Sequence, residues 1–496
     1  MMRRPAAFPV LSIALVAVAC VGPFRSAPTA PRRDTDRALA RMTDSLIGAP
    51  MFANANWGIL IVDPARGDTL VARNAAKLFM PASNQKLLTG ATALAQLGRD
   101  FRWRTMLHGG GPIVDGVLRG DLIVVGRGDP SVSDAAYGDA MVPLRALADS
   151  LAARGVREVA GALVRGGDAF PDTTTGFGWP ADGFDFAYSA GVDELTFNEG
   201  YATVVVRGGA TVGAPVTVRT SPAAGIPTIG SVAVRTVARG ERATRVEWES
   251  DVRGARPVLA VSGTVAVGDS AVIDVALRDP GAAWLDAFAQ ALAARGIRVR
   301  GNVIAAPTVP LPTSPPLVTW QSRTLAEVLP LFEKPSQNQI GELFIRTLGL
   351  EKGRAGTASA GRAVIEQQLN AWGADTMGRA VRDGSGLSRH DYVTPQTIVK
   401  VLDAMRQHPD FKTFYDALPI AGVDGTIRSR MRGTKAAGNV HAKTGTVDKV
   451  RSLSGYVTAA DGRVLLFSML CNNFTVPNRE VERVQDALLV HLATGR

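Results

Sequence analysis

Cysteine is scarce in this chain: only Cys20 and Cys471 occur among 496 residues. A disulfide framework is therefore excluded, and a hydrophobic core must supply the stability. Cys471 lies in the apolar run RVLLFSMLCNNF, which predicts a buried thiol with a packing role. Histidine is also rare, and the five histidines show no metal-ligand spacing, so no metal site is predicted.

Aromatic residues make up 6% and charged residues 20% of the chain, against 46% apolar residues. That balance indicates a globular protein, neither disordered nor membrane-embedded. The net charge is +10, but the basic residues form no dense block and are not interleaved with aromatics, so nucleic-acid binding is not expected. The length exceeds that of one compact core, and we expect two or three domains.

Long apolar segments are missing after the first twenty residues. Residues 6–19, AAFPVLSIALVAVA, are nearly all apolar and follow Arg3 and Arg4. A positive end followed by a short apolar run is typical of a secretory signal, and this run is too short to span a bilayer. We therefore expect residues 1–19 to be a signal peptide and the mature protein to be exported to the periplasm or the cell envelope.

The end of this signal allows two interpretations. Ala17 and Ala19 fit ordinary signal cleavage, whereas a small residue followed by Cys20 resembles a bacterial lipoprotein site, at which the cysteine is lipidated. In the second case a lipid on Cys20 would attach the protein to a membrane. Residues 20–44 are rich in Pro, Arg and Ala, which predicts a flexible tether.

Helix and strand patterns at both ends of the chain enclose a β-rich middle. The segment 57–74 predicts a strand, a turn and a strand, and 83–98 predicts a helix with leucines on one face. From about residue 104 the sequence alternates with the two-residue period of β-strands, and a helix is predicted over 283–295. A proline-rich linker, APTVPLPTSPPL, occupies 306–317.

After this linker the helical pattern returns. Residues 325–347 and 357–372 are predicted helices, and 452–470 is a predicted hairpin that turns at Asp461 and Gly462. The C-terminal segment predicts a helix with one apolar stripe.

These patterns predict a discontinuous α/β domain. We assign 45–103 and 317–496 to it, separated by a β-rich insert over 104–316. A second domain is expected to be nested in the insert at roughly 200–280.

The stretch PASNQKLLTG, residues 81–90, places Ser83 and Lys86 three positions apart at a predicted helix start. Side chains at this spacing are neighbours on a helix, so the amine can reach the hydroxyl. A serine hydroxyl is a poor nucleophile unless a base takes its proton, and a lysine can be that base only if burial or a nearby cation lowers its pKa. The alternative interpretation is a serine helix cap followed by a solvated lysine.

Two further triplets favour catalysis. SQN begins at Ser336 and ends at Asn338, whose amide can both donate to and accept from a peptide backbone. KTG begins at Lys443, a second cation that can lower the pKa of Lys86 and attract a carboxylate. Gly445 closes this triplet and permits close approach of an extended substrate.

Together SNQK, SQN and KTG match the Ser-x-x-Lys, Ser-x-Asn and Lys-Thr-Gly set of penicillin-binding proteins and class A β-lactamases. The segments DGSGLSRHDYVTP (383–395), GVDGTIRSRM (422–431) and VHAKTGTVDKVRSLSGYV (440–457) extend the similarity, as does the long gap between the first two triplets. The sequence resembles a low-molecular-mass class C penicillin-binding protein, a D-alanyl-D-alanine carboxypeptidase/endopeptidase.

The resemblance implies a role for each motif residue. Ser83 would attack the carbonyl between two terminal D-alanines of a peptidoglycan stem peptide, and Lys86 would accept its proton. Ser336 would relay a proton to the leaving amine, while Asn338 would hold the substrate backbone and contact Lys86. Water would release the acyl-enzyme, and β-lactam antibiotics would mimic the dipeptide and trap Ser83. No metal or organic cofactor is implied.

The same resemblance assigns the substrate carboxylate to one strand. Lys443 and the hydroxyls of Thr444 and Thr446 would receive it, beside Gly445. The backbone N–H groups of Ser83 and Thr446 would form the oxyanion hole.

Two residues concern the side chain of the stem peptide. Arg389, in DGSGLSR, matches a family position that helps to read this side chain; the alternative is a surface arginine. The family usually has an aspartate four residues before a phenylalanine of the insert. Here Gly166 has that spacing from Phe170, and Asp168 is nearer, so a role of Asp168 in binding a diamino-acid side chain departs from the family pattern.

The implied fold is the penicillin-binding-protein/β-lactamase-like transpeptidase fold, a multidomain α/β (α+β) arrangement. Its antiparallel sheet is flanked by helices and, here, interrupted by the large β-rich insert. The main alternative is a β-lactamase, which in class A needs a dedicated deacylating glutamate that no motif places. A non-enzymatic cell-wall scaffold is the other, although every motif residue is present. Carboxypeptidase and endopeptidase activities need the same residues.

Overall fold

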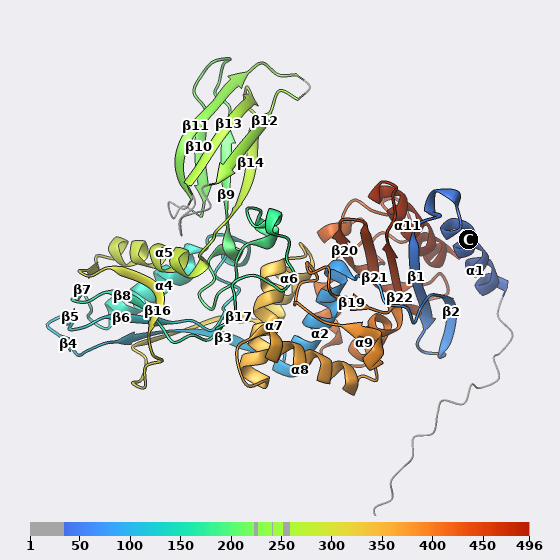
Figure 1. Ribbon diagram of the computed structural model, residues 1–496, viewed down its shortest axis with the longest axis horizontal. Coiled ribbons are helices and arrows are strands. Elements are labelled where there is room, and N and C mark those ends of the chain that lie inside the picture. Colours follow the sequence, from blue (N-terminus) through green and yellow to red (C-terminus); the bar gives the residue numbers. More distant parts are fainter. Residues whose placement is uncertain (1–33, 223–226, 241, 251–257, 496) are drawn as a thin grey trace, which may run out of the picture.

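The computed structural model describes residues 34–222, 227–240, 242–250 and 258–495. The expected signal peptide and Cys20 lie outside these residues. The molecule is elongated: both ends of the described chain form one lobe, and the insert extends away from it (Figure 1). Within the described residues no helix combines the length and the apolar character needed to cross a membrane.

One five-stranded antiparallel sheet joins the two ends of the chain. Its order is β2-β1-β22-β21-β20, with β1 Asn56–Asp63, β2 Asp68–Arg73, β20 His441–Val447, β21 Val450–Thr458 and β22 Val464–Asn472. Strands β1 and β22 pair antiparallel, with Trp57 opposite Cys471. The predicted strand-turn-strand and the predicted C-terminal hairpin are confirmed, and both belong to this sheet.

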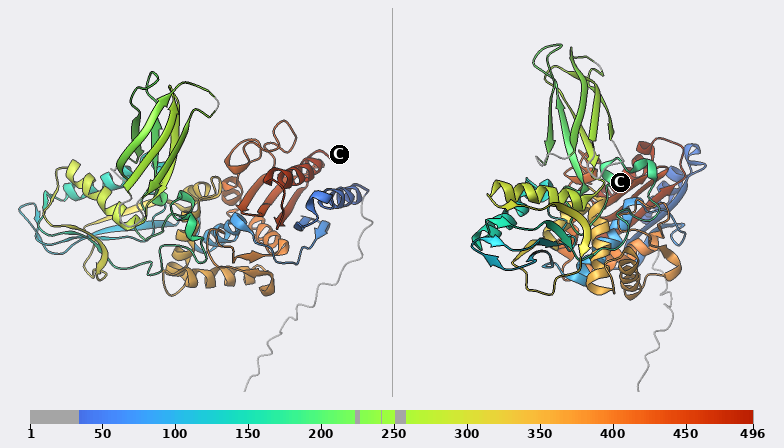
Figure 2. Two further views of the ribbon diagram at one scale, coloured as in Figure 1. Left: turned by 45° about the horizontal axis from the view of Figure 1, so that its top comes forward. Right: turned by 60° about the vertical axis from the view of Figure 1, so that its left-hand side comes forward.

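Alternate residues of this sheet face two separate cores. Ile59, Ile61 and Phe467 pack on one face, and Leu60 and Leu466 on the other. The first face is covered by α1 (Asp34–Ile47) and α11 (Asn478–Thr494), and the second by α2 (Gln85–Leu97) and α9 (Pro395–Arg406). An antiparallel sheet with helices on both sides, as expected, therefore forms this lobe (Figure 2).

Part of the expected tether is a helix, because residues 34–44 belong to α1. Leu39 is 2% exposed, and Met42 and Leu46 pack against the same core. These apolar side chains recur at three- and four-residue spacing on one helix face, a period that the Pro, Arg and Ala composition concealed. The helix contacts β2 and α11, so it belongs to the folded lobe.

The helix predicted over 325–347 is two helices. Besides α2 and α9, the helical layer contains α6 (Leu325–Glu333), α7 (Asn338–Lys352), α8 (Ala358–Ala371) and α10 (Phe411–Ala417). The break between α6 and α7 contains Pro335, which disfavours helical backbone in the residue before it. Ser336 then has a left-handed φ of 67°. The interruption places the SQN triplet on a turn at the start of α7.

The insert contains a five-stranded mixed sheet of order β16-β8-β6-β3-β17. Its strands are β3 Arg102–Gly109, β6 Leu122–Val125, β8 Leu163–Gly166, β16 Val303–Val309 and β17 Val318–Thr324. Helices α4 (Met141–Ala153) and α5 (Pro280–Ala294) pack with it around one core. Shorter elements are α3 Asp134–Tyr137, β4 Ile113–Val114, β5 Val117–Leu118, β7 Glu158–Val159, β15 Arg298–Val299, β18 Arg379–Ala380 and β19 Tyr392–Val393.

Two boundaries of the insert differ from the prediction. Strand β17 pairs antiparallel with β3, with Val318 opposite Leu107. Residues 318–324 therefore belong to the insert and not, as predicted, to the discontinuous α/β domain. The predicted linker over 306–317 begins inside β16, which pairs with β8. Both pairings join segments far apart in the sequence, which local patterns do not reveal.

A smaller β domain projects from the insert near α5 (Figures 1 and 2). One of its sheets contains β9 Tyr201–Arg207, β10 Thr217–Ser221 and β14 Ser270–Ala276, and the other β11 Thr228–Val237, β12 Arg245–Ser250 and β13 Val258–Ala266. Val204, Val206 and Leu259 belong to the small core between them. This domain occupies the region where a nested domain was expected.

Candidate active site

The predicted nucleophile lies on a tight turn directly before a helix. Ser83 is in the 3₁₀ turn Ala82–Asn84, and α2 follows with Lys86 in its first turn. The Nζ of Lys86 lies 3.0 Å from Oγ of Ser83, within hydrogen-bond distance. The serine is thus not a helix cap, and the lysine is not solvated, because Lys86 is 0% exposed.

Lys86 is held by two further acceptors. Its Nζ donates to Oδ1 of Asn338 over 2.6 Å and to the carbonyl oxygen of Ser385 over 2.7 Å. Burial, and next the positive charge of Lys443, lower the pKa of Lys86 to about 7. The amine is therefore available as a base near neutral pH, as the sequence argument required.

Lys443 forms a second lysine–serine pair. Its Nζ lies 2.8 Å from Oγ of Ser336 and donates to the carbonyl oxygen of Thr444 over 3.1 Å. Burial lowers the pKa of Lys443 to about 8, and the carboxylate of Glu333 opposes this shift. The hydroxyls of Thr444 and Thr426 lie 2.7 Å apart, so Thr444 is fixed from the neighbouring loop.

Strand β20 passes directly against the nucleophile turn. A Cβ at Gly445 would lie 2.5 Å from the carbonyl oxygen of Pro81 and 3.0 Å from the backbone nitrogen of Ser83. Only glycine permits this approach. The side chain of Asn84 donates to the carbonyl oxygen of Lys443 over 2.9 Å and joins turn and strand.

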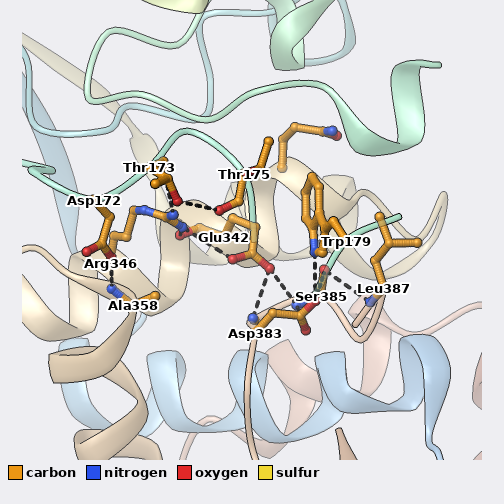
Figure 3. A network of polar contacts seen from close by, with 12 residues as sticks. Asp172, Thr173, Thr175, Trp179, Glu342, Arg346, Ala358, Asp383, Ser385 and Leu387 are labelled. Atoms are coloured by element: carbon orange, nitrogen blue, oxygen red, sulfur yellow. Dashed lines mark hydrogen bonds and ion pairs between the residues drawn. The ribbon is translucent and has the colours of Figure 1, made fainter. Parts of the chain in front are cut away.

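The loop that accepts from Lys86 is held by two buried carboxylates (Figure 3). Oε1 of Glu342 accepts from the backbone nitrogens of Gly384, at 2.9 Å, and Ser385, at 3.1 Å. Asp383 accepts from the nitrogen of Gly386 over 2.6 Å. No catalytic motif of the sequence pointed to Glu342, although Asp383 begins the recognised segment DGSGLSR.

Side chains of the insert complete this network. Nε1 of Trp179 donates to Oδ2 of Asp383 over 2.9 Å. Arg346, paired with Glu342 at 3.2 Å, donates to the carbonyl oxygen of Thr173 over 3.0 Å (Figure 3). The segment 173–179 of the insert therefore packs on the loop behind Lys86.

A cleft of about 430 Å³ opens above Ser83. Its lining comes from both lobes and includes Ser83, Pro180, Tyr188, Asn338, Gly386, Leu387, Arg389, Thr446, Val447 and Asp448. Tyr188 of the insert, which sequence reasoning missed, also accepts from Nδ2 of Asn338 through its carbonyl oxygen at 2.7 Å. Nη1 of Arg389 donates to the carbonyl oxygen of Asp448 over 3.0 Å, so Arg389 belongs to the cleft rim.

Asp168 is not among the residues that line this cleft. Its carboxylate is 47% exposed and lies 3.9 Å from Arg165, whose guanidinium is paired with Asp193 and Glu194. The structure therefore brings the three motifs and Arg389 together but leaves Asp168 apart. Across the described residues, no group of three or more His, Cys, Asp or Glu side chains could hold a metal ion.

Comparisons with known proteins agree with this geometry. A D-alanyl-D-alanine carboxypeptidase of an Actinomadura species is 35% identical over 484 residues, covering 92% of this chain and 86% of that protein. The D-alanyl-D-alanine carboxypeptidase DacB of Haemophilus influenzae is 25% identical over 434 residues, covering 86% and 87%. The crystal structure of penicillin-binding protein 4 from Haemophilus influenzae superposes with a TM-score of 0.74 at 24% identity, covering 91% of this chain and 98% of that one.

The same Haemophilus protein has also been solved with a bound β-lactam, and that structure gives a TM-score of 0.70 at 25% identity, again covering 91% and 98%. The expected fold and family resemblance are thus confirmed. The profile of the D-Ala-D-Ala carboxypeptidase 3 (S13) family matches residues 39–494. With the serine–lysine pair in place, the chain belongs to this family of serine-type D-Ala-D-Ala carboxypeptidases.

Proposed function

We propose that Ser83 and Lys86 perform the acyl transfer of a D-Ala-D-Ala carboxypeptidase acting on peptidoglycan stem peptides. The observation that carries the proposal is the 3.0 Å distance from Nζ of Lys86 to Oγ of Ser83. The amine of Lys86 is fully buried, and its pKa is lowered to about 7. Lys86 takes the proton of Ser83 while Oγ bonds to the carbonyl carbon of the scissile D-Ala-D-Ala peptide. The resulting oxyanion is stabilised by backbone N–H groups of Ser83 and Thr446.

The leaving D-alanine needs a proton and a site for its carboxylate. Ser336, 2.8 Å from Lys443, is positioned to relay to the leaving amine the proton that Lys86 took from Ser83, so that Lys86 is neutral again when the C–N bond has broken. The ammonium of Lys443 and the hydroxyls of Thr444 and Thr446 offer charge-assisted hydrogen bonds to the carboxylate. Water then attacks the acyl-enzyme, which releases the shortened peptide and returns Ser83 to its hydroxyl form.

Slow release of a β-lactam is the expected consequence of this site. A class A β-lactamase uses a glutamate to activate the deacylating water. None of the described residues that line the cleft is a glutamate, and Glu342 is committed to Arg346 and to backbone N–H groups. A β-lactam acyl-enzyme on Ser83 should therefore persist, which favours a penicillin-sensitive peptidase over a β-lactamase.

The direct test is intact mass spectrometry after mixing the protein with benzylpenicillin, with Ser83→Ala alongside. A lasting adduct of one drug mass, absent in the variant, is expected. Consumption of the drug without an adduct would indicate β-lactamase turnover. No adduct with intact drug would contradict both enzymatic roles of Ser83. A substrate ending in D-Ala-D-Ala and a cross-linked dimer, supplied in parallel, distinguish carboxypeptidase from endopeptidase activity.

We further propose that the protein is exported and is either free in the periplasm or attached to the envelope through a lipid on Cys20. The support is the basic N-terminus followed by the apolar run and Cys20. Expression of the full chain and of Cys20→Ala in a Gram-negative host, followed by membrane fractionation and intact mass, tests this. A diacylglyceryl mass on the wild type alone indicates a lipoprotein; soluble forms whose masses differ only by the substitution itself indicate ordinary cleavage. Retention in the cytoplasm would contradict export.

A further inference from the structure

A fully buried carboxylate lies behind the site without a partner. Glu333 is the last residue of α6, three positions before Ser336, and its side chain is 0% exposed. Neither of its oxygens receives a hydrogen bond from the described residues. A buried carboxylate in this state costs free energy unless nearby positive charge compensates it, and the mechanism above makes no use of it.

Gly90 leaves the space that this carboxylate occupies. It lies on α2, one helical turn after Lys86, and a Cβ at this position would stand 2.7 Å from Oε1 of Glu333. The carboxylate therefore packs against the helix that carries the base. The charged side chains that act on Glu333 are Lys443 and Lys86, both of which favour its ionised form, whereas burial raises its pKa to about 7.

The two lysines differ in the carboxylates around them. Lys86 is influenced by Asp383, Glu333 and Glu342 as well as by Lys443. Among the charged groups of the described residues, the carboxylate of Glu333 is the one that raises the pKa of Lys443 and so favours its protonated form. Because a buried ammonium is costly without a nearby negative charge, the protonation of Lys443 depends on Glu333 more than that of Lys86 does.

We propose that Glu333 is the counter-charge that keeps Lys443 protonated while Lys86 stays neutral. The inference rests on the roles proposed above for these two lysines. One proton then resides on Lys443, where it meets the substrate carboxylate, and Lys86 is free to receive the proton of Ser83. Glu333 touches neither the substrate nor the reacting atoms, so it is a positioning residue that acts through Lys443.

The test is the pH profile of the second-order rate of acylation by benzylpenicillin, which carries a carboxylate for Lys443. In Glu333→Gln the loss of negative charge weakens proton binding by Lys443, so the alkaline limb should move to lower pH by about one unit. The acid limb, set by Lys86 with its other carboxylates, should move less. Glu333→Asp retains the charge, and its alkaline limb should lie between those of wild type and Glu333→Gln.

Asp129→Asn is the matched control, because it neutralises another buried carboxylate, 3% exposed, within the insert. Its profile should match that of the wild type. Cooperative unfolding of Glu333→Gln would show that this variant is folded. An alkaline limb at its wild-type position in the folded variant would overturn the proposal, and so would an equal loss of rate at every pH. If Glu333→Gln does not fold, Glu333→Leu takes its place, because an apolar side chain needs no partner in this buried position: an alkaline limb at its wild-type position in that uncharged variant overturns the proposal.

The same experiment separates this proposal from the proposed function. Acylation of Ser83→Ala would contradict the assignment of the nucleophile, whatever Glu333 does. Normal dependence on Ser83 with an unmoved alkaline limb would contradict only the role of Glu333.

Discussion

Nε1 of Trp179, in the insert, donates a hydrogen bond to the carboxylate of Asp383 in the catalytic domain over 2.9 Å. Asp383 in turn accepts a hydrogen bond from the backbone nitrogen of Gly386. In the same loop, the carbonyl oxygen of Ser385 accepts a hydrogen bond from Nζ of Lys86. The insert is therefore hydrogen-bonded, through one carboxylate, to the loop that binds Lys86, the proposed catalytic base. We therefore expect contacts of the insert to influence the position of Lys86.

Replacing Trp179 by phenylalanine should slow acylation. The variant keeps an aromatic ring but removes the donor to a buried carboxylate, a hydrogen bond whose loss typically costs about 1–3 kcal/mol. With the 383–386 loop less constrained, we expect the benzylpenicillin acylation rate to fall about tenfold, together with a lower thermal unfolding midpoint.

Trp320→Phe is the matched control for this prediction. Nε1 of Trp320 donates to the buried carboxylate of Asp129 over 3.2 Å, within the insert and away from the cleft. This variant should lose stability but acylate at the wild-type rate. Equal slowing in both variants would show that the effect of Trp179 is general destabilisation.

A methyl group at position 445 should abolish acylation. In Gly445→Ala the new Cβ would lie 2.1 Å from Oγ of Ser452 and 3.0 Å from the nitrogen of Ser83, so strand β20 and the nucleophile turn must separate. Loss of one oxyanion donor typically costs about 10²–10³ in rate. We expect at least this loss in single-turnover acylation, with the secondary structure intact by circular dichroism.

Gly240→Ala is the corresponding control, since a Cβ at Gly240 would meet no atom of the described residues within 4 Å. It should acylate normally. A Gly445→Ala variant with more than a tenth of the wild-type rate would show that the turn and the strand can separate without loss of the oxyanion hole.

The catalytic motifs could be predicted from the sequence because their chemistry depends on short spacings. Ser83 and Lys86 are three residues apart, and Ser336 precedes Asn338 by two, so local pattern and family resemblance both identify them. Glu333 and Trp179 belong to no catalytic motif. Trp179 reaches Asp383 across 204 positions of the chain, a contact that only the folded insert creates.

The same distinction holds for the fold. The β1–β2 hairpin and the C-terminal hairpin follow from period-two patterns and turn residues that lie side by side in the sequence. The pairing of β17 with β3 and the packing of α1 depend on partners far along the chain. For that reason the local patterns place 318–324 with the catalytic domain and 34–44 in a tether, whereas the structure places them in the insert and in α1.

The lowered pKa of Lys86 predicts a pH-dependent contribution to stability. The group binds a proton with a pKa of about 7 when folded and near its ordinary 10.5 when unfolded. Between these values the unfolded chain holds a proton that the folded chain lacks, so stability rises with pH across this window and is lowest below pH 7. Relative to Lys86→Met, the wild type should gain on the order of 1 kcal/mol per pH unit above pH 7.

Denaturant unfolding of both proteins at pH 6, 7.5 and 9 measures this difference. Because Lys443 is present in both proteins, its direct titration largely cancels in the comparison. A difference that stays constant with pH would mean that Lys86 remains charged in the folded enzyme and cannot be the base for Ser83.

Arg389 should distinguish substrates by the side chain of the stem peptide. Arg389 is exposed and lies on the cleft rim, with Nη1 donating to the carbonyl oxygen of Asp448. Peptides that carry a side-chain carboxylate near the scissile bond can form a charge-assisted hydrogen bond there. In Arg389→Ala, kcat/KM for such peptides should fall about tenfold, mainly through KM, whereas acylation by benzylpenicillin should change less than twofold.

Arg382→Ala removes another exposed arginine of the same segment, which does not line the cleft, and should leave both rates unchanged. The kinetics are measured with two peptides that differ only in the presence of the side-chain carboxylate, so that kcat/KM for the two peptides is compared within each enzyme variant. If Arg389→Ala lowers kcat/KM equally for both peptides, the arginine supports the cleft rim through Asp448 and does not read the substrate side chain. A loss confined to the carboxylate-bearing peptide assigns Arg389 to recognition.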